Sequence, residues 1–311
     1  ADAVRAKVPD ALGRLHEATF YMRGKTAIIE LAEACGIKLL KRKERDVLNA
    51  NTQGMGTLVN HALQCGARDF ILCVGGSASV DGGLGALVEM GLEAEIEGGQ
   101  RNYLLGIKRL HVDSLRNKFS GIRFTILCDV ENPLVGPTGS AAVFGPQKGA
   151  TPEQVALLDS LLSEYADMLQ ASTGHDVSRM PMGGAAGGIT ASFRALLDAD
   201  LVSGADYCLS ISHFDERLAE VQAVVTGEGH LDSQSLGGKI PGTVARVCKA
   251  HDMPVYAVAG VAEKEAASCF NHVLTFSSLA ASTADSIKNA PYYLKLMAEP
   301  LIDAFYSGFH Y

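Results

Sequence analysis

The stretch Phe70-Ile-Leu-Cys-Val74, followed directly by Gly75-Gly-Ser-Ala-Ser-Val-Asp-Gly-Gly83, decides the fold. The apolar run predicts a buried β-strand, and the glycine-rich segment predicts a tight turn into a helix. Such a turn exposes backbone N–H groups to a phosphate at a helix N-terminus. Asp81 within the turn favours a functional site over a purely structural turn, since a carboxylate there can bind a metal or hold a hydroxyl group.

Further apolar runs that end in glycine or polar residues occur at 122–128, 221–225, 255–259 and 273–276. Near-continuous apolar strands alternating with helices indicate a parallel sheet covered on both faces. The predicted fold class is α/β, with a doubly wound, mostly parallel sheet domain and a smaller, discontinuous α/β domain. We assign residues 41–131 and 206–311 to the doubly wound domain, and 1–40 and 132–205 to the smaller one.

The middle of the chain carries loop and helix signals. Residues 132–149 and 181–188 are rich in glycine, so both are predicted to be loops. Residues 151–154, Thr-Pro-Glu-Gln, combine an N-cap, a proline at the first helical position and a capping-box glutamine. A helix is therefore predicted from there to about residue 169, and another over 189–197.

Composition excludes several classes of protein. The 311 residues suffice for two compact domains, and the net charge of −8 argues against a nucleic-acid partner. The apolar runs are too short to span a bilayer and no signal-peptide pattern opens the chain, so we expect a cytoplasmic protein without a membrane partner. The seven scattered cysteines indicate reduced thiols. An anionic substrate would need local cations, for which Lys148, Arg194 and Lys239 are candidates.

Carboxylates follow two more of the predicted strands. Glu228 and Asp232 lie in Thr226-Gly-Glu-Gly-His-Leu-Asp-Ser-Gln-Ser235, after the run 221–225, and Asp129 follows the run 122–128. Ligands of open α/β sheets bind outside the carboxyl ends of the strands. We therefore expect these carboxylates to bind a metal, move a proton or hold a hydroxyl-bearing substrate.

Two familiar nucleotide-binding motifs are missing, and one hydrolase motif is nearly present. The chain has neither Gly-x-Gly-x-x-Gly in the turn at 75–83 nor a Walker A motif at Gly238-Lys239. Gly75-Gly-Ser-Ala-Ser79 differs by one residue from Gly-x-Ser-x-Gly, which would make Ser77 a nucleophile. No histidine is obviously placed to serve as its base, so a serine hydrolase stays an alternative.

Taken together, these segments resemble the glycerate kinases of the bacterial, glycerate-catabolising type. The resemblance lies in the motifs at 75–83, 128–136, 143–150, 183–188, 226–235 and 238–241. It implies ATP-dependent phosphorylation of D-glycerate, with 2-phosphoglycerate favoured over 3-phosphoglycerate, and ATP and Mg²⁺ as cofactors. The oligomeric state is left open, with a homo-oligomer allowed.

The chain departs from the family pattern at three places. The family's opening strand, which ends in Asp-Ser-Phe/Tyr-Lys, and its later Ala-Asp-Gly-Gly-Glu-Gly-Thr motif have no counterpart in residues 1–311. The resemblance therefore implies that the chain starts about a fifth of the way into the family pattern. His230 stands where an arginine is expected, and Val80 stands in place of an asparagine.

The resemblance also implies roles for individual residues. The catalytic set, in which an aspartate accepts the hydroxyl proton and a lysine neutralises phosphate or carboxylate, is Asp232, Asp129 and Lys148. The nucleotide- and phosphate-binding set is Gly75, Gly76, Ser77, Gly227 and Lys239. The substrate-binding set is Ser79, Gln234 and Gly187, and the metal-binding set is Asp81 and Glu228. A non-catalytic module that binds a nucleotide or hydroxy acid is the remaining alternative.

Overall fold

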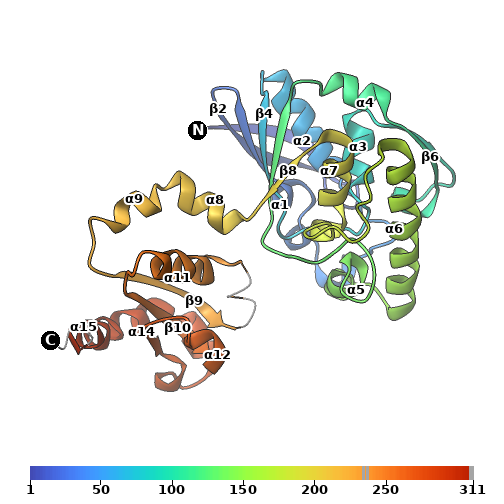
Figure 1. Cartoon of the computed structure of the whole chain (residues 1–311). Helices are drawn as coiled ribbons and strands as arrows, with labels where there is room; N and C mark the ends of the chain where they lie inside the picture. The colour runs from blue at the N-terminus through green and yellow to red at the C-terminus, as the bar shows by residue number, and fades with distance from the viewer. Residues whose placement is uncertain (233–234, 236–237, 308–311) are drawn as a thin grey trace. The chain divides into compact units, whose positions relative to one another are not determined.

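The structure, a computed structural model, describes residues 1–311 except 233–234, 236–237 and 308–311. Contacts divide the chain into two compact units, Ala1–Val202, coloured blue to yellow in Figure 1, and Ser203–Tyr311, coloured yellow to red. This division differs from the predicted domains. Strand β3 (Thr26–Glu30) pairs with β4 (Asp69–Cys73) in one sheet, which joins residues 1–40 to the segment assigned to the other domain.

The first unit is built on a six-stranded sheet with the order β1-β2-β3-β4-β7-β8. The remaining strands of this sheet are β1 (Asp2–Pro9), β2 (Leu15–Arg23), β7 (Arg123–Leu127) and β8 (Asp200–Val202). Pairing is antiparallel from β1 to β3 and parallel from β3 to β8. The mixed α/β fold with a parallel sheet core confirms the predicted fold class.

Alternating side chains of the central strands form the core of this unit. Phe70 and Leu72 of β4 are buried, and their partners Phe124 and Ile126 on β7 are buried beside them. The rings of Phe70 and Phe124 stack with centroids 4.9 Å apart, and Phe193 meets Phe124 edge-on at 5.7 Å. Aromatic pairs in these arrangements stabilise a core beyond the area that they bury.

Helices and a small hairpin surround this sheet. The helices are α1 (Leu31–Cys35), α2 (Gln53–Gln64), α3 (Leu84–Met90), α4 (Asp113–Lys118), α5 (Ser140–Phe144), α6 (Pro152–Thr173) and α7 (Ile189–Leu197), with short 3₁₀ turns η1 (Ile37–Leu39), η2 (Arg42–Glu44), η3 (Tyr103–Leu105), η4 (Pro146–Lys148) and η5 (Ala185–Gly187). The hairpin is β5 (Glu93–Ile96) and β6 (Ile107–His111).

Two of the predicted helices form, and one predicted loop contains short helical turns. The capping box at Thr151 starts α6 as predicted, although the helix continues to Thr173. Helix α7 coincides with the predicted helix over 189–197. The segment 132–149, predicted to be a loop, contains α5 and η4, because its small residues permit short helical turns between the glycines.

The second unit contains a three-stranded parallel sheet with the order β11-β10-β9. Its strands are β9 (Val224–Leu231), β10 (Val255–Ala262) and β11 (His272–Thr275). Its helices are α8 (Gly204–Ile211), α9 (Phe214–Leu218), α11 (Ile240–Ala250), α12 (Lys264–Ala267), α13 (Thr283–Lys288), α14 (Ala290–Leu296) and α15 (Ala298–Ser307), with the 3₁₀ turn η6 (Ser277–Leu279).

Strand β9 lies further along the chain than predicted. The apolar run 221–225 was expected to be the strand, with Glu228 beyond its end. In the structure Glu228 pairs with Ala259 and His230 with Val261, so β10 carries β9 through Leu231. The prediction for this strand end is therefore wrong, because a long parallel partner supplies hydrogen bonds that the apolar pattern does not reveal.

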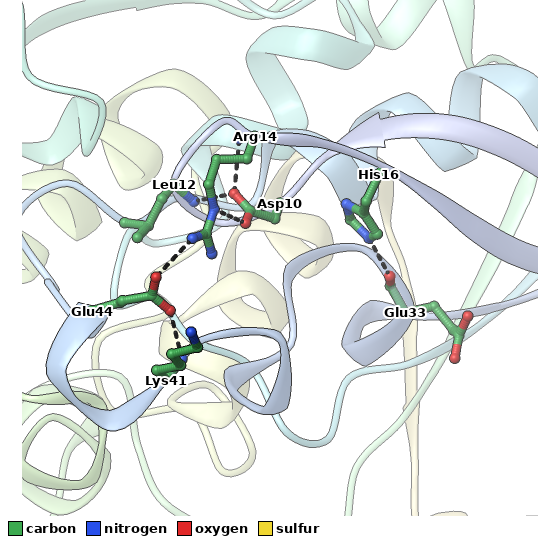
Figure 2. A network of polar contacts seen from close by, with 7 residues as sticks. All are labelled: Asp10, Leu12, Arg14, His16, Glu33, Lys41 and Glu44. Atoms are coloured by element: carbon green, nitrogen blue, oxygen red, sulfur yellow. Dashed lines mark hydrogen bonds and ion pairs between the residues drawn. The ribbon is translucent and has the colours of Figure 1, made fainter.

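A network of polar contacts holds the turn between β1 and β2 (Figure 2). Asp10, 5% exposed, accepts hydrogen bonds from the backbone N–H groups of Leu12 and Arg14, both at 2.9 Å. The Arg14 guanidinium bridges Asp10 at 2.6 Å and Glu44 at 3.0 Å. Glu44 in turn accepts from the N–H of Lys41 at 2.8 Å. The hairpin turn is thereby tied to η2.

Among the residues that the structure describes, no helix is long and apolar enough to cross a membrane.

The cap of α6 provides a test of local stability. The Thr151 hydroxyl accepts from the N–H of Gln154 at 3.3 Å, and Gln154 returns a contact to the N–H of Thr151 at 2.9 Å. Thr151→Ala should lower the free energy of unfolding by about 1 kcal/mol, because helix N–H groups lose a partner. Urea denaturation followed by circular dichroism measures it. Ser163→Ala, at an exposed position of the same helix, is the matched control and should be nearly neutral.

Candidate functional site

The turn after β4 leads into α3, as the sequence predicts, and its glycines are required by its geometry. Gly76, Gly82 and Gly83 have φ angles of +73°, +60° and +77°. A Cβ on Gly82 would lie 2.8 Å from Cε1 of Tyr165, a buried residue of α6. Only glycine meets both conditions at no cost.

Asp81 is the anchor of this turn. Its side chain is fully buried. Oδ2 accepts from the N–H of Thr52 at 2.8 Å, the hydroxyl of Thr52 at 2.7 Å and the N–H of Gly85 at 3.2 Å. Oδ1 accepts from the Ser79 hydroxyl at 2.9 Å and the N–H of Gly83 at 3.4 Å. These donors occupy the four or so acceptor positions of a carboxylate. The geometry thus argues against the predicted metal role of Asp81.

Lys148, on η4, is buried against the same turn. Its Nζ donates to the Ser77 hydroxyl and to the Ser79 carbonyl, both at 2.7 Å, and the residue is 2% exposed. Burial lowers the pKa of Lys148 to about 7, and the negative charge of Asp81 opposes this shift only in part. Both hydrogen-bond acceptors are uncharged oxygens, so the lysine is held in place without being neutralised.

A cavity of about 240 Å³ opens at the carboxyl ends of β4 and β7. It is lined by Val74, Gly75, Gly76, Ser77, Leu127, Cys128, Asp129, Val130, Phe144, Gln147, Lys148, Ala185 and Ala186. Five of these, Gly75, Gly76, Ser77, Asp129 and Lys148, are site residues that the sequence predicts. Gly75, Gly76, Ser77 and Asp129 meet here because adjacent parallel strands end at one edge of the sheet, and Lys148 reaches the cavity from η4.

Two predicted substrate residues lie behind the cavity wall and outside its lining. The Ser79 hydroxyl faces Asp81 and its carbonyl faces Lys148. Gly187, at φ +83°, packs so closely on the turn that a Cβ would lie 2.3 Å from the Ser79 carbonyl oxygen. Its own carbonyl accepts from the N–H of Gly82 at 2.9 Å. Both residues therefore hold the shape of the turn and do not line the cavity.

The second unit carries the other predicted site residues. Gly227 and Glu228 line an apolar cavity of about 580 Å³ between β9 and the helices α14 and α15. Asp232 accepts from the N–H of Ser235 at 2.9 Å and from its hydroxyl at 3.0 Å, and the backbone contact is the main cause of the lowered pKa of Asp232. Nζ of Lys239 lies 3.6 Å from Asp232 Oδ1. Gln234 lies outside the described residues.

The two predicted metal-binding carboxylates, Asp81 and Glu228, differ in their ability to hold a cation. Among the described residues, no three His, Cys, Asp or Glu side chains gather into a metal-ligand cluster. Glu228 Oε1 is shielded from solvent and has no hydrogen-bond partner among the residues that the structure describes. A cation can satisfy such an oxygen, and Mg²⁺ needs only one or two carboxylates when substrate phosphates complete its shell. Glu228 therefore fits a metal better than Asp81 does.

Sequence reasoning missed Thr52, which contributes two of the donors to Asp81 and also accepts from the N–H of Ala86 at 2.9 Å. Thr52 lies 29 residues from Asp81 along the chain, outside every motif. Its only signal is its place before α2, where a threonine is normally interpreted as a helix cap. Gln147 and Phe144, which line the cavity, were missed as well.

Known proteins resemble this chain over most of its length. The sequence profile of the glycerate kinase family matches residues 1–305. Glycerate kinase from Halalkalibacterium halodurans is 36% identical over 273 residues, which span 86% of this chain and 72% of that protein. Glycerate 2-kinase from Escherichia coli K12 is 39% identical over 245 residues, spanning 76% of this chain and 64% of that protein.

A solved structure agrees with the sequence relatives. The crystal structure described as glycerate kinase 2 from Salmonella typhimurium LT2 has a TM-score of 0.80 and 33% identity, and the match covers 99% of this chain and 83% of that one. The fold, with polar residues at the ends of its parallel strands, and these relatives define an α/β kinase. The chain belongs to the glycerate kinase family. The resemblance and the predicted enzyme class, glycerate kinase, are thereby confirmed.

The Asp81→Asn variant distinguishes a structural role of Asp81 from a metal-binding role. The amide nitrogen cannot accept the hydrogen bonds that the carboxylate receives, so the free energy of unfolding should fall by about 2–4 kcal/mol. Guanidinium denaturation measures the change. The exposed Asp176→Asn serves as the control and should cost less than about 1 kcal/mol. A variant that loses activity at full stability would instead restore the metal role.

Lys148→Met should raise the melting temperature, because burying this ammonium group destabilises the folded protein. The pKa of Lys148 is about 7 when folded and ordinary when unfolded, so the penalty is complete at and below pH 7. It shrinks as pH rises toward 10, where the unfolded lysine also loses its proton. We expect a gain of about 3–8 °C at pH 6 that fades by pH 10. Calorimetry checks this, and a gain independent of pH would contradict it.

Proposed function

We propose that this protein phosphorylates D-glycerate with ATP and releases 2-phosphoglycerate. The observation that carries the proposal is the cavity at the ends of β4 and β7, where family motifs contribute Ser77, Asp129 and Lys148. Membership of the glycerate kinase family supports the reaction class. The name of the Escherichia coli relative, glycerate 2-kinase, supports the 2-phospho product.

Asp129 is the proposed general base. As the substrate hydroxyl attacks the γ-phosphorus, its proton passes to the carboxylate of Asp129, the new O–P bond forms and ADP departs. Such transfer depends on positioning and charge neutralisation more than on covalent catalysis. Asp232 is the weaker candidate, because Asp129 lines the cavity with Ser77 and Lys148 and Asp232 does not.

Residues of the second unit are the proposed nucleotide and metal ligands. Glu228 would hold Mg²⁺ through its unpartnered Oε1, and Gly227, which lines the same cavity, would contact the nucleotide beside β9. Lys239 would neutralise phosphate oxygens in exchange for its present contact with Asp232. When bound, Mg²⁺ supplies positive charge that offsets the charge of the phosphates.

The proposed setting is the cytoplasm, with D-glycerate and ATP as partners and with no nucleic-acid or membrane partner. The net charge of −8 supports the lack of a nucleic-acid partner. Self-association into a homo-oligomer belongs to the same proposal, and light scattering on the purified protein tests it.

A serine hydrolase is the second candidate, and one observation favours it. Lys148 Nζ lies 2.7 Å from the Ser77 hydroxyl, so a lysine can replace the histidine that the sequence lacks. A fluorophosphonate probe distinguishes the two activities. We expect no label at Ser77, whereas stoichiometric labelling would support the hydrolase. A coupled ADP-release assay with D-glycerate separates a kinase from a protein that only binds its ligands, and NMR of the product identifies the phosphorylated carbon.

Asp129→Asn should lower kcat about a hundredfold or more, because loss of a general base usually costs at least that much. The KM for D-glycerate should change only a fewfold. Steady-state kinetics with the coupled assay measures both constants. Asp232→Asn is the matched comparison and should leave kcat within about tenfold. If Asp232→Asn proves the more damaging substitution, Asp232 is the base.

A further inference from the structure

The size of the cavity decides which substrate enters it. A water molecule occupies about 30 Å³ in the liquid, so the 240 Å³ cavity holds a molecule of a few non-hydrogen atoms. A three-carbon hydroxy acid fits this space. A nucleoside triphosphate is several times larger than the cavity. The volume of the cavity therefore matches the acceptor of the phosphoryl group better than its donor.

The charges of the cavity wall select the same substrate. Lys148 presents a buried ammonium group whose two acceptors, Ser77 Oγ and the Ser79 carbonyl, are neutral. The nearby Asp81 carboxylate is already shared among five protein donors. A buried charge without a counter-ion is costly. An anion entering the cavity would remove that cost.

We propose that this cavity is the acceptor-acid subsite, in which Lys148 and Ser77 together bind the substrate carboxylate. This inference rests on the proposed function and deepens it. The Ser77 hydroxyl accepts from Lys148, which leaves its own hydrogen free to donate to a carboxylate oxygen. The proposal assigns Gly75, Gly76 and Ser77 to the binding of the acid and not to the predicted nucleotide-phosphate set. The phosphates would then be bound by other residues.

The arrangement also sets the orientation of the bound substrate and makes the site selective for acids over glycerol. The carboxylate lies at the lysine, and the hydroxyl group is left for Asp129, which lines the same cavity from the end of β7. Glycerol has the hydroxyl groups but no carboxylate, so it would leave the buried lysine unpaired. A site built for a polar group rejects the analogue that lacks it far more strongly than it would reject a missing methylene.

Binding should be coupled to protonation of Lys148. The charged groups around it are Asp81 in the turn, Asp129 at the end of β7 and Arg45, whose guanidinium donates to the Gln147 carbonyl at 2.8 Å. In the free protein the pKa of Lys148 is about 7. A bound carboxylate favours the ammonium form and raises that pKa. The complex therefore takes up a proton above pH 7, and affinity should fall by up to about tenfold per pH unit there.

Steady-state kinetics of Lys148→Met tests the subsite. We expect the KM for D-glycerate to rise about a hundredfold, as for the loss of a charged hydrogen-bonded pair, while the KM for ATP stays within about threefold. The preference for D-glycerate over glycerol should fall by a similar factor. Ser77→Ala should raise the KM for D-glycerate about tenfold. Lys108→Met removes an exposed lysine of β6 and should change neither constant.

Calorimetric titration of D-glycerate tests the same inference without turnover. In buffers of different ionisation enthalpy at pH 8, the wild-type protein should take up a proton on binding, and Lys148→Met should take up none. A Lys148→Met protein with an unchanged KM for D-glycerate and a raised KM for ATP overturns the subsite while the kinase function stands. If the wild-type protein binds D-glycerate with proton uptake but transfers no phosphate, the proposed function fails and the subsite stands.

Discussion

The buried carboxylate of Asp81 is the constraint on which the candidate site depends. Its donors come from three segments: the residue before α2, the turn after β4 and the first turn of α3. Satisfying a fully buried charge in this way fixes these segments relative to one another, since an unpaired buried acceptor costs the full desolvation energy. The turn so held presents Ser77 to the cavity and the Ser79 carbonyl to Lys148.

Asp81 and Lys148 are both buried beside one turn, yet their energetic roles are opposite. Asp81 is saturated with donors and stabilises the fold. Among the described residues Lys148 donates to two neutral acceptors, and burial lowers its pKa to about 7, which indicates that keeping it charged there is unfavourable. Groups held in such unfavourable surroundings are concentrated at functional sites, where a ligand supplies what the protein withholds. The difference between the two residues separates the framework of the site from its binding surface.

The sequence predicts the local elements well and the distant partners poorly. The strand at 70–74, the turn after it and the cap at Thr151 follow from short-range patterns, and the structure has all three. The convergence of Asp129 with the turn follows from the rule for parallel sheets. Three features could not be predicted. The length of β9 depends on its partner β10, the role of Asp81 depends on Thr52, and the division into units depends on which strands pair.

In the proposed subsite, burial and not the number of lysines would favour the binding of a small anion. The chain carries a net charge of −8, so its long-range field repels an organic acid. A solvent-exposed lysine would offset this only weakly, because salt screens exposed charges beyond about 8 Å and water competes for the ammonium group. Lys148 lies where neither effect operates fully, since it is 2% exposed and lines a cavity of only about 240 Å³. A carboxylate bound in the proposed subsite would offset the cost of desolvating this lysine, so the subsite would favour acids over uncharged analogues.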